Sequence, residues 1–376
     1  MHIQCNRISD ELTGSAELAD AWNRLASDVP FQTWDWLEAW WRTYGNCADQ
    51  CGRASELATI AVRDDAGRLI GLAPWYFENS SWHGRVLRFL GTHGVCSDYL
   101  GILAEPGREA DVAAALATWL TEQARGQWDL IELDSVDPEN MVVCHLAAQM
   151  KSRGSLINLR PGPICWQIPL PTDWETYLAG LSQSHRKQVR RRERRLFETG
   201  RAVLRSVNCE DDRLAAFAIL VDLHQRRQIS LGNHGSFASG SFRAFHQEVT
   251  RRFLQRGRLR LHWLELDGRP VAAEYGLAGT RAVYSYQGGF DPAASDESPG
   301  HVVTQATLKL AIEQGFSAFD FLRGDEPYKA HWRAIARPSV RLRIVAAHAS
   351  ARIRHGVWVA ATTLKDQLAG AFEGPS

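Results

Sequence analysis

Residues 298–332 read SPGHVVTQATLKLAIEQGFSAFDFLRGDEPYKAHW, and this stretch decides the fold that we expect. The pattern predicts a loop, a helix from Gly300 to about Gln314, a glycine stop, and a short apolar strand from Phe316 to Leu322. Ionisable side chains follow at the end of that strand. This order is typical of α/β proteins, which bind ligands at the carboxyl edge of the sheet.

The start of the predicted helix is the first candidate binding site. Backbone N–H groups in the first turn of a helix have no intrahelical partner, and the helix dipole favours an anion there. Ser298 and Gly300 lie at the helix start, and His301 and Val302 follow in its first turn. These residues predict a phosphate or carboxylate site. For His301 and for His331, which flank the region, capping or packing is the alternative.

The end of the predicted strand is the candidate catalytic site. Its ionisable residues are Asp320, Arg323, Asp325, Tyr328 and Lys329. Such a set can supply a general base, an ion pair that orients it, and a cation near developing negative charge. The alternative, on spacing alone, is an ion-paired turn.

Two further candidates lie in the strands that precede this region. Glu274 stands in the apolar run VAAEYGL, where an unpartnered carboxylate costs several kcal/mol, so we expect it to have a partner or face a cleft. Gln287 ends the next strand, and the two glycines after it permit close approach by a ligand. In the first half, a loop with His93, Asp98 and Tyr99 could line the other wall of a cleft.

Length and composition favour two globular domains. The chain has 376 residues, which suits two domains of roughly 150 to 200 residues each. Lys plus Arg and Asp plus Glu both total 43, so the net charge gives no sign of a nucleic-acid partner. The N-terminus has no signal-peptide core, and no apolar run approaches the length of a membrane span. We therefore expect a soluble cytoplasmic protein. The seven scattered cysteines do not indicate a metal site.

The two halves of the chain repeat one order of predicted elements. The first half has predicted strands at 57–63, 69–77 and 86–90, a helix at 108–124 and a strand at 128–133. The second half has strands at 259–266, 270–277 and 282–287, the helix from 300 and the strand 316–322. The repeat indicates internal duplication. We expect an α/β (α+β) protein with mixed sheets flanked by helices, an interdomain cleft, domains at 1–162 and 163–347 joined at the Pro-Gly-Pro of 161–163, and a C-terminal helix within 348–376.

A strongly basic helix is predicted from Ser182 to Thr199. Its cations include Lys187, Arg190, Arg191 and Arg194. Such a helix can pair with the phosphates of a nucleotide, a coenzyme or tRNA, or with an anionic membrane surface. The alternative is a solvated helix whose charges are balanced by acids elsewhere in the chain.

With these motifs in view, the chain resembles the GNAT-like acyltransferases associated with cellulose and exopolysaccharide biosynthesis, which are similar to Fem-type aminoacyltransferases. The resemblance covers about Phe31 to Val345. It rests on FQTWDWLEAWW, LSQSHRKQVRRRERRL, DGRPVAA, SPGHV and FDFLRGDEPYK. It implies two GNAT-type domains in tandem and transfer of an acyl group from a thioester or an aminoacyl ester to an amine or hydroxyl.

The resemblance also implies roles for single residues. The segment 298–302 stands where the pyrophosphate of coenzyme A would meet the helix start, and we expect Gln287 and Arg323 to contribute to that site. Lys329 matches the lysine that Fem-type enzymes place near the reacting carbonyl. We expect acyl-CoA as donor, a small-molecule, saccharide or peptide acceptor, Asp320 or Glu274 as base, and no metal.

Two alternatives keep the fold and change the function. The donor could be an aminoacyl-tRNA held by the basic helix, since the chain lacks the Q/R-x-x-G-x-G/A phosphate loop of single-domain GNAT proteins. The chain could also be a non-catalytic scaffold that binds a partner in polysaccharide synthesis. The acceptor, the acyl-chain length and the oligomeric state do not follow from the sequence.

Overall fold

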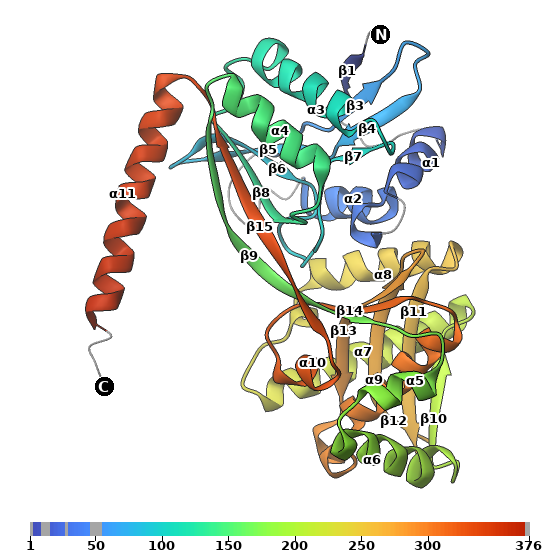
Figure 1. Ribbon diagram of the computed structural model, residues 1–376. Helices are drawn as coiled ribbons and strands as arrows, with labels where there is room; N and C mark the ends of the chain where they lie inside the picture. Colours follow the sequence, from blue (N-terminus) through green and yellow to red (C-terminus); the bar gives the residue numbers. More distant parts are fainter. Residues whose placement is uncertain (1–2, 9–15, 27–28, 46–54, 373–376) are drawn as a thin grey trace. The chain divides into compact units, whose positions relative to one another are not determined.

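The computed structural model describes residues 3–8, 16–26, 29–45 and 55–372, the last eleven of these by their backbone only (Figure 1). The chain groups into two compact units. The first is Met1–Ala26, Trp40–Gly162 and Pro338–Ser376, and the second is Ser27–Ala39 and Pro163–Arg337. The predicted domain limits at 162 and 347 stay a prediction. The units differ from them in the segments 27–39 and 338–347.

Within its described residues, the first unit contains strands of two sheets. The antiparallel order of one is β1 (Gln4–Arg7), β3 (Ile60–Arg63), β4 (Leu69–Ala73) and β7 (Leu103–Ala104). The order of the other is β15 (Ile335–Val345), β8 (Leu130–Val136), β6 (Gly84–Phe89), β5 (Trp75–Ser80) and β2 (Ser55–Leu57). Its helices are α1 (Ala16–Leu25), α3 (Glu109–Thr118), α4 (Met141–Ser152) and α11 (Ala349–Phe372). The pair β6 and β8 is parallel, so this sheet is mixed.

The predicted strands 57–63 and 69–77 lie side by side as an antiparallel pair, but each is divided in two. β3 pairs with β4 in one sheet, and β2 pairs with β5 in the other. The break falls at Pro74, which has no N–H to donate to a ladder and whose carbonyl accepts from the Leu90 N–H at 2.8 Å. Each of the two apolar segments therefore contributes one strand to each sheet.

The second unit is built on a mixed sheet. The order of its strands is β10 (Ala202–Ser206), β11 (Leu259–Leu266), β12 (Arg269–Ala278), β13 (Ala282–Phe290), β14 (Ala318–Arg323) and β9 (Leu156–Pro169). Only the pair β13 and β14 is parallel among these described strands. The predicted fold class, α/β with mixed sheets flanked by helices, is confirmed.

Helices cover both faces of this sheet. The helices of the second unit are α2 (Trp34–Trp40), α5 (Trp174–Gly180), α6 (Gln183–Arg192), α7 (Glu210–Ser230), α8 (Gly240–Gln255), α9 (Pro299–Glu313) and α10 (Pro327–His331). On β12, Tyr275 contacts His246 of α8, whereas the adjacent Glu274 lines a cavity with Thr307 of α9. Because successive strand residues face opposite sides, α8 and α9 lie on opposite faces of the sheet.

The aromatic helix α2 is part of the core of the second unit. Trp36 is fully buried, and its ring lies 4.9 Å from Phe245 and 5.4 Å from Tyr286, measured between ring centroids. Arg252 of α8 pairs with Glu38, and Arg256, the residue after α8, pairs with Asp35. This helix is thus a packing element of the second unit.

The Pro-Gly-Pro segment 161–163 lies inside a strand rather than in a linker. β9 runs unbroken through it, and one boundary between the two units falls inside β9, between Gly162 and Pro163. Residues two apart in a strand point their backbone N–H groups to the same side. Pro161 and Pro163 therefore both lack an N–H on one side of β9, which a strand tolerates where that side needs no donor. Among the described residues, no helix has the length and apolar character needed to cross a membrane.

Candidate active site

The centre of the second unit is a place where two parallel strands separate. β13 and β14 pair only from Ala282 with Ala318 to Tyr284 with Asp320. Beyond this point β14 bends, its register with β9 shifts, and Leu322 has a φ of 58°. The strand ends carry the candidate residues, and α9 begins after β13. Polar residues thus follow the last backbone pair between β13 and β14, where the two strands separate.

Glu274 is a buried carboxylate with one recorded hydrogen-bond partner. Its side chain is on β12, and the residue is 7% exposed. The Ser285 hydroxyl donates to Glu274 Oε1 at 2.8 Å. Burial raises the pKa of Glu274 to about 7, against a smaller lowering by the Ser285 hydrogen bond. A carboxyl that titrates near neutral pH is suited to general-base work. The expectation that this residue has a partner or faces a cleft is met by the Ser285 partner.

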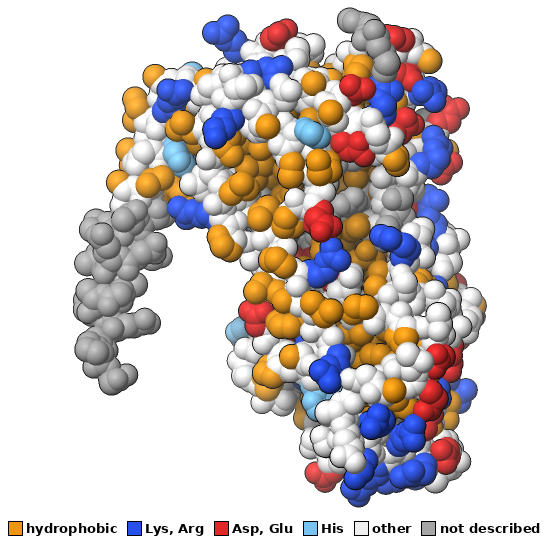
Figure 2. Space-filling model, viewed as in Figure 1, with side chains coloured by type: hydrophobic (Ala, Val, Ile, Leu, Met, Phe, Trp, Pro, Cys, Tyr) orange, Lys and Arg blue, Asp and Glu red, His pale blue; other side chains and the backbone are white. Residues whose placement is uncertain are grey.

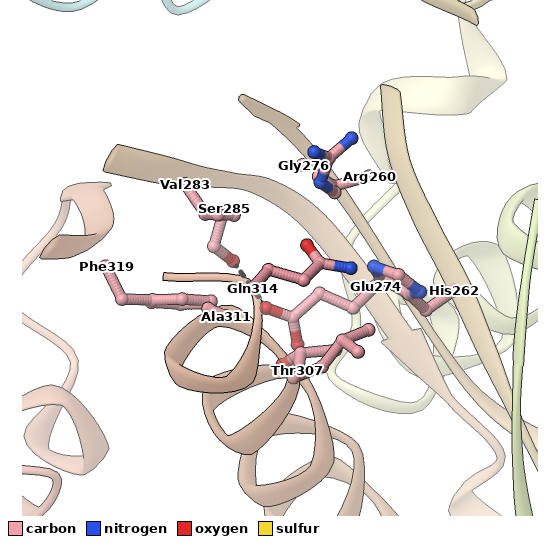
Figure 3. Close-up of a pocket in the computed structure, with 11 residues that line it drawn as sticks. Arg260, His262, Glu274, Gly276, Val283, Ser285, Thr307, Ala311, Gln314 and Phe319 are labelled. Atoms are coloured by element: carbon pink, nitrogen blue, oxygen red, sulfur yellow. Dashed lines mark hydrogen bonds between the residues drawn. The ribbon is translucent and has the colours of Figure 1, made fainter. Parts of the chain in front are cut away.

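The cavity beside Glu274 is small and mostly enclosed by β11, β12, β13 and α9. Figure 3 shows the Glu274 carboxylate pointing toward Ser285 and Thr307, with His262 on the neighbouring strand. Arg260 and Gln314 also line it. Its volume of about 10 Å³ is close to the room that one water molecule needs. It can hold a water next to the carboxylate.

His262 is an uncharged neighbour of Glu274. It lies opposite Glu274 in the β11–β12 register, and its Nδ1 is 2.8 Å from the Ser206 hydroxyl. Burial, helped by the nearby charge of Arg260, lowers the pKa of His262 to about 4. The imidazole is therefore neutral at pH 7 and does not stabilise the ionised form of Glu274.

Tyr328 is within electrostatic reach of Glu274. It lies on α10, and its ring packs against Phe321 at a centroid distance of 5.6 Å. Burial and the negative charges of Glu274 and Glu326 raise the pKa of Tyr328, so its hydroxyl stays protonated at neutral pH. The charge of Glu274 thus acts on Tyr328, and a catalytic role for either residue stays a prediction.

Lys329 has a different environment from the one predicted. The residue is 2% exposed, and its ammonium donates to the carbonyls of Leu322, Arg323 and Gly324 at 3.3, 2.8 and 3.0 Å. It also pairs with Glu326 at 2.9 Å. An ammonium has three N–H donors, and these contacts occupy them. Lys329 holds the turn after β14 in this structure, and its predicted role near the reacting carbonyl stays a prediction.

Asp320 also stabilises the bend after β14. Its carboxylate accepts from the Leu322 N–H at 2.7 Å and from Gln167 at 3.1 Å, and the residue is fully buried. Asp325, near the surface, accepts from the Trp166 indole at 3.3 Å. These contacts match the ion-paired or hydrogen-bonded turn that spacing left open. Arg323 lies half-buried in the same turn.

The start of α9 has few backbone donors left for an anion. Pro299 has no N–H, and the N–H groups of His301 and Val302 both donate to the Ser298 carbonyl, at 2.9 and 3.1 Å. Ser298 has a φ of 52° and forms no side-chain cap. Val302 is buried in the core. Of the residues 298–302, the structure leaves the Gly300 N–H without a recorded partner.

Of the two glycines after Gln287, Gly289 serves packing rather than ligand approach. A Cβ at Gly289 would lie 2.3 Å from the backbone nitrogen of His224, so the glycine lets α7 approach β13 closely. Gln287 itself forms a hydrogen bond with the His224 side chain. At Gly289 the expectation of ligand approach is corrected, because helix backbone fills the space; at Gly288, where a Cβ would meet only the Ala273 carbonyl oxygen at 3.4 Å, it stays a prediction.

The predicted basic helix is divided into α6 and a π-helical turn, Glu193–Phe197. Figure 2 shows Lys and Arg side chains concentrated at the end of the second unit that carries α6. Arg190 pairs with Glu175 at 2.7 Å, whereas Lys187, Arg191 and Arg194 are exposed and have no ion pair among the described residues. Arg190 thus fits the alternative of a charge-balanced surface helix, and phosphate binding by Lys187, Arg191 and Arg194 stays a prediction.

Asp98 and Tyr99 lie in the first unit, and both are buried. Tyr99 has a φ of 57°, which is rare for a residue with a side chain. The Glu274 cavity and the α10 turn belong to the second unit. A substrate role for Asp98 and Tyr99 remains a prediction.

Several residues around the site escaped sequence reasoning. They are Ser285, His262, Thr307 and Gln314. Ser285 stands in the strand AVYSY, where a polar residue in an apolar alternation could have been a signal. The others carry no local signal, because only strand register and helix packing bring them to Glu274. Within the described residues, no group of three or more His, Cys, Asp or Glu is arranged to hold a metal ion.

Comparisons with known proteins agree with this fold. Residues 183–330 match the family described as the acetyltransferase (GNAT) domain. The crystal structure of FemX covers 92% of this chain and 98% of its own, with a TM-score of 0.63 and 12% identity. No curated protein sequence matches the chain. The matched segment contains Glu274, Tyr328 and the start of α9, and it supports an acyltransferase of the GNAT type.

Two further solved structures have the same fold. A conserved protein of unknown function from Bacteroides thetaiotaomicron covers 92% of this chain and all of its own, with a TM-score of 0.57 and 11% identity. L-PGS from Bacillus licheniformis covers 90% and 93%, with a TM-score of 0.52 and 11% identity. At these identities the likeness establishes the fold and leaves the substrates open.

Proposed function

We propose that this chain is an acyltransferase that moves an acyl group from a coenzyme A thioester to an amine or hydroxyl, with Glu274 as the general base. The observation that carries the proposal is a buried carboxyl in the GNAT-type unit whose pKa is raised to about 7. It lies beside a donor hydroxyl and a cavity of about 10 Å³, room for one water.

The proposed reaction is direct transfer. The acceptor N–H or O–H gives its proton to Glu274, through Ser285 or a water in the cavity, and its nitrogen or oxygen attacks the thioester carbonyl. The C–S bond then breaks, and the leaving thiolate takes the proton back from Glu274, directly or through water, so the base is restored. Coenzyme A supplies the thioester when bound. The chain supplies a carboxyl whose pKa, raised by burial, lies between those of the two proton transfers.

Of the two predicted bases, the geometry favours Glu274 over Asp320. The Asp320 carboxylate already accepts a backbone N–H and the Gln167 side chain. Hydrogen bonds to the charged form of a carboxylate lower its basicity. Glu274 accepts one recorded hydrogen bond, so its remaining lone pairs can receive a proton.

Release of free thiol from acyl-CoA, measured with a panel of amines and hydroxyl compounds, tests the proposal. We expect acceptor-dependent release whose kcat/KM rises with pH through about 7 and then levels, because the base must be ionised. Glu274→Gln should lose this limb. Glu265→Gln, which changes an ion-paired carboxylate on β11, is the matched control. A pH profile shared by both variants and the wild type would remove Glu274 from the mechanism.

A second candidate donor is an aminoacyl-tRNA. It is favoured by the exposed and unpaired Lys187, Arg191 and Arg194, which recur on one side of α6 and the turn after it. The resemblance to Fem-type aminoacyltransferases points the same way. Binding of tRNA that weakens steeply with salt, and that is lost when these three residues are changed to Gln, would support this donor. Absence of tRNA binding excludes it and leaves acyl-CoA. Failure to bind either donor would favour a scaffold.

A further inference from the structure

A cluster of basic and aromatic rings joins three helices at the start of α9. His185 of α6 stacks on His331 of α10, with ring centroids 3.7 Å apart, and Trp332 lies 4.7 Å from His185. The ring of His301, in the first turn of α9, is 6.1 Å from that of His331. Arg192, the last residue of α6, acts electrostatically on both His185 and His301. We call these five residues the histidine–arginine cluster.

The cluster contains buried polar nitrogens without hydrogen-bond partners. They are His185 Nε2, Arg192 Nη1 and Trp332 Nε1. His185 is 2% exposed and Trp332 is fully buried. The His185 ring is oriented by a hydrogen bond with the His331 backbone, which leaves Nε2 as the unpaired ring atom. Arg192 Nη1 and Trp332 Nε1 are donors, whereas Nε2 of the neutral His185 ring is an acceptor until the ring is protonated. Unpaired buried polar atoms are costly, and most native proteins avoid them.

Burial and neighbouring basic groups also lower pKa values within the cluster. Burial and the basic neighbours His331 and Arg192 lower the pKa of His185 to about 4. Burial, Arg192 and His331 also lower the pKa of His301, and burial and Arg195 lower that of Arg192. The charged groups behind these shifts are all basic. An anion bound among them would relieve the repulsion, accept from Arg192 Nη1 and Trp332 Nε1, and favour the protonated form of His185, in which Nε2 donates.

The cluster also explains how an anion could bind where the helix backbone cannot hold it. Pro299 removes one N–H from the first turn of α9, and the His301 N–H is already bonded to Ser298. A guanidinium presents a planar fork of donors that matches a phosphate. His331 is exposed and His301 half-buried, so the cluster is open to solvent.

We propose that the histidine–arginine cluster binds a phosphate group of the coenzyme donor through side chains, in place of a backbone phosphate loop. Arg192 supplies the fixed charge, and the imidazoles supply donors that charge when the phosphate is present. The inference rests on the proposed function, since it assigns a subsite for that donor. It adds residues of α6 and α10 to a site that the sequence places only on residues 298–302.

Calorimetric titration of the full chain with coenzyme A, and separately with inorganic pyrophosphate, tests this subsite. We expect Arg192→Met to weaken binding of both by about tenfold or more. Arg190→Met is the matched control: it removes the same charge from the same helix, but Arg190 is already paired with Glu175 at the surface. It should leave both affinities within about twofold.

Thermal unfolding without ligand gives a second measurement. The same variant that weakens binding is expected to increase stability. Removing an unpaired cation from a basic cluster should raise the melting temperature of Arg192→Met above that of the wild type. His331→Asn, which changes an exposed residue, provides a variant that does not depend on the core and should also weaken both ligands. Wild-type affinities in Arg192→Met and His331→Asn would overturn the inference, as would a wild type that binds neither ligand.

The two proposals fail in different ways. If coenzyme A binds and Arg192→Met does not change its affinity, the cluster is not the subsite and the acyl-CoA donor stands. If coenzyme A does not bind but pyrophosphate binds in an Arg192-dependent way, the anion site stands and the coenzyme donor is wrong.

Discussion

Glu274 and Lys329 are both buried ionisable residues of the second unit, and their surroundings differ completely. Lys329 donates to three carbonyls and pairs with Glu326. Glu274 accepts one recorded hydrogen bond, beside a cavity, and its pKa is raised to about 7. A fully paired buried charge holds structure together, whereas an underpaired one is free to exchange a proton. The comparison separates a turn-stabilising lysine from a candidate base.

The largest effect that we expect is on turnover of Glu274→Gln. The amide keeps the shape of the side chain and cannot take a proton, so kcat should fall by about 100-fold to 10,000-fold. Thiol release from acyl-CoA at saturating acceptor measures it, with Glu265→Gln as control. Unchanged turnover would place Glu274 with Lys329 among the structural residues.

Lys329→Met should mainly change stability. Loss of the ammonium leaves buried carbonyls of the 322–324 turn without donors, at a cost of roughly 3 to 5 kcal/mol in the free energy of unfolding. Urea denaturation measures the loss, and kcat of the remaining folded enzyme should stay within about tenfold of wild type. A variant of normal stability with abolished turnover would restore the role at the reacting carbonyl that the sequence predicted.

The pH dependence of stability sharpens the same comparison. The pKa of Glu274 is raised from 4.5 to about 7 in the folded state, so the folded state binds the proton more tightly than the unfolded state. Its contribution is fully present below pH 4.5 and is lost as pH rises to about 7, a loss of roughly 3 kcal/mol. Glu274→Gln should not show this loss. Urea denaturation at pH 5 and pH 8 compares the two proteins.

The smallest effect concerns Ser285. Its hydroxyl lowers the pKa of Glu274, so Ser285→Ala should raise that pKa further. The rising limb of kcat/KM against pH should therefore move to higher pH, while the plateau stays close to wild type. A profile that keeps its midpoint would show that the hydrogen bond does not tune the base.

Much of the second unit was predictable from local sequence. The limits of β11 and α9 agree with the expected ones to within a residue, because the alternation and the helix period are strong there. The strand β10 and the division of the basic segment at Arg192 carried no clear local signal. In the first unit, the apolar runs were found, but their division between two sheets depends on Pro74 and on partners far along the chain.

The sequence by itself determined the α/β class and the order of most elements. It also showed that the carboxylate of Glu274, inside an apolar strand, needs a partner or a cleft. Only the tertiary structure decided which charges are paired. Strand register brings Ser285 to Glu274, and the turn after β14 delivers three carbonyls to Lys329. Helix packing brings His185 against His331. Burial and hydrogen bonding depend on these long-range contacts, and they set the pKa and the role of an ionisable residue.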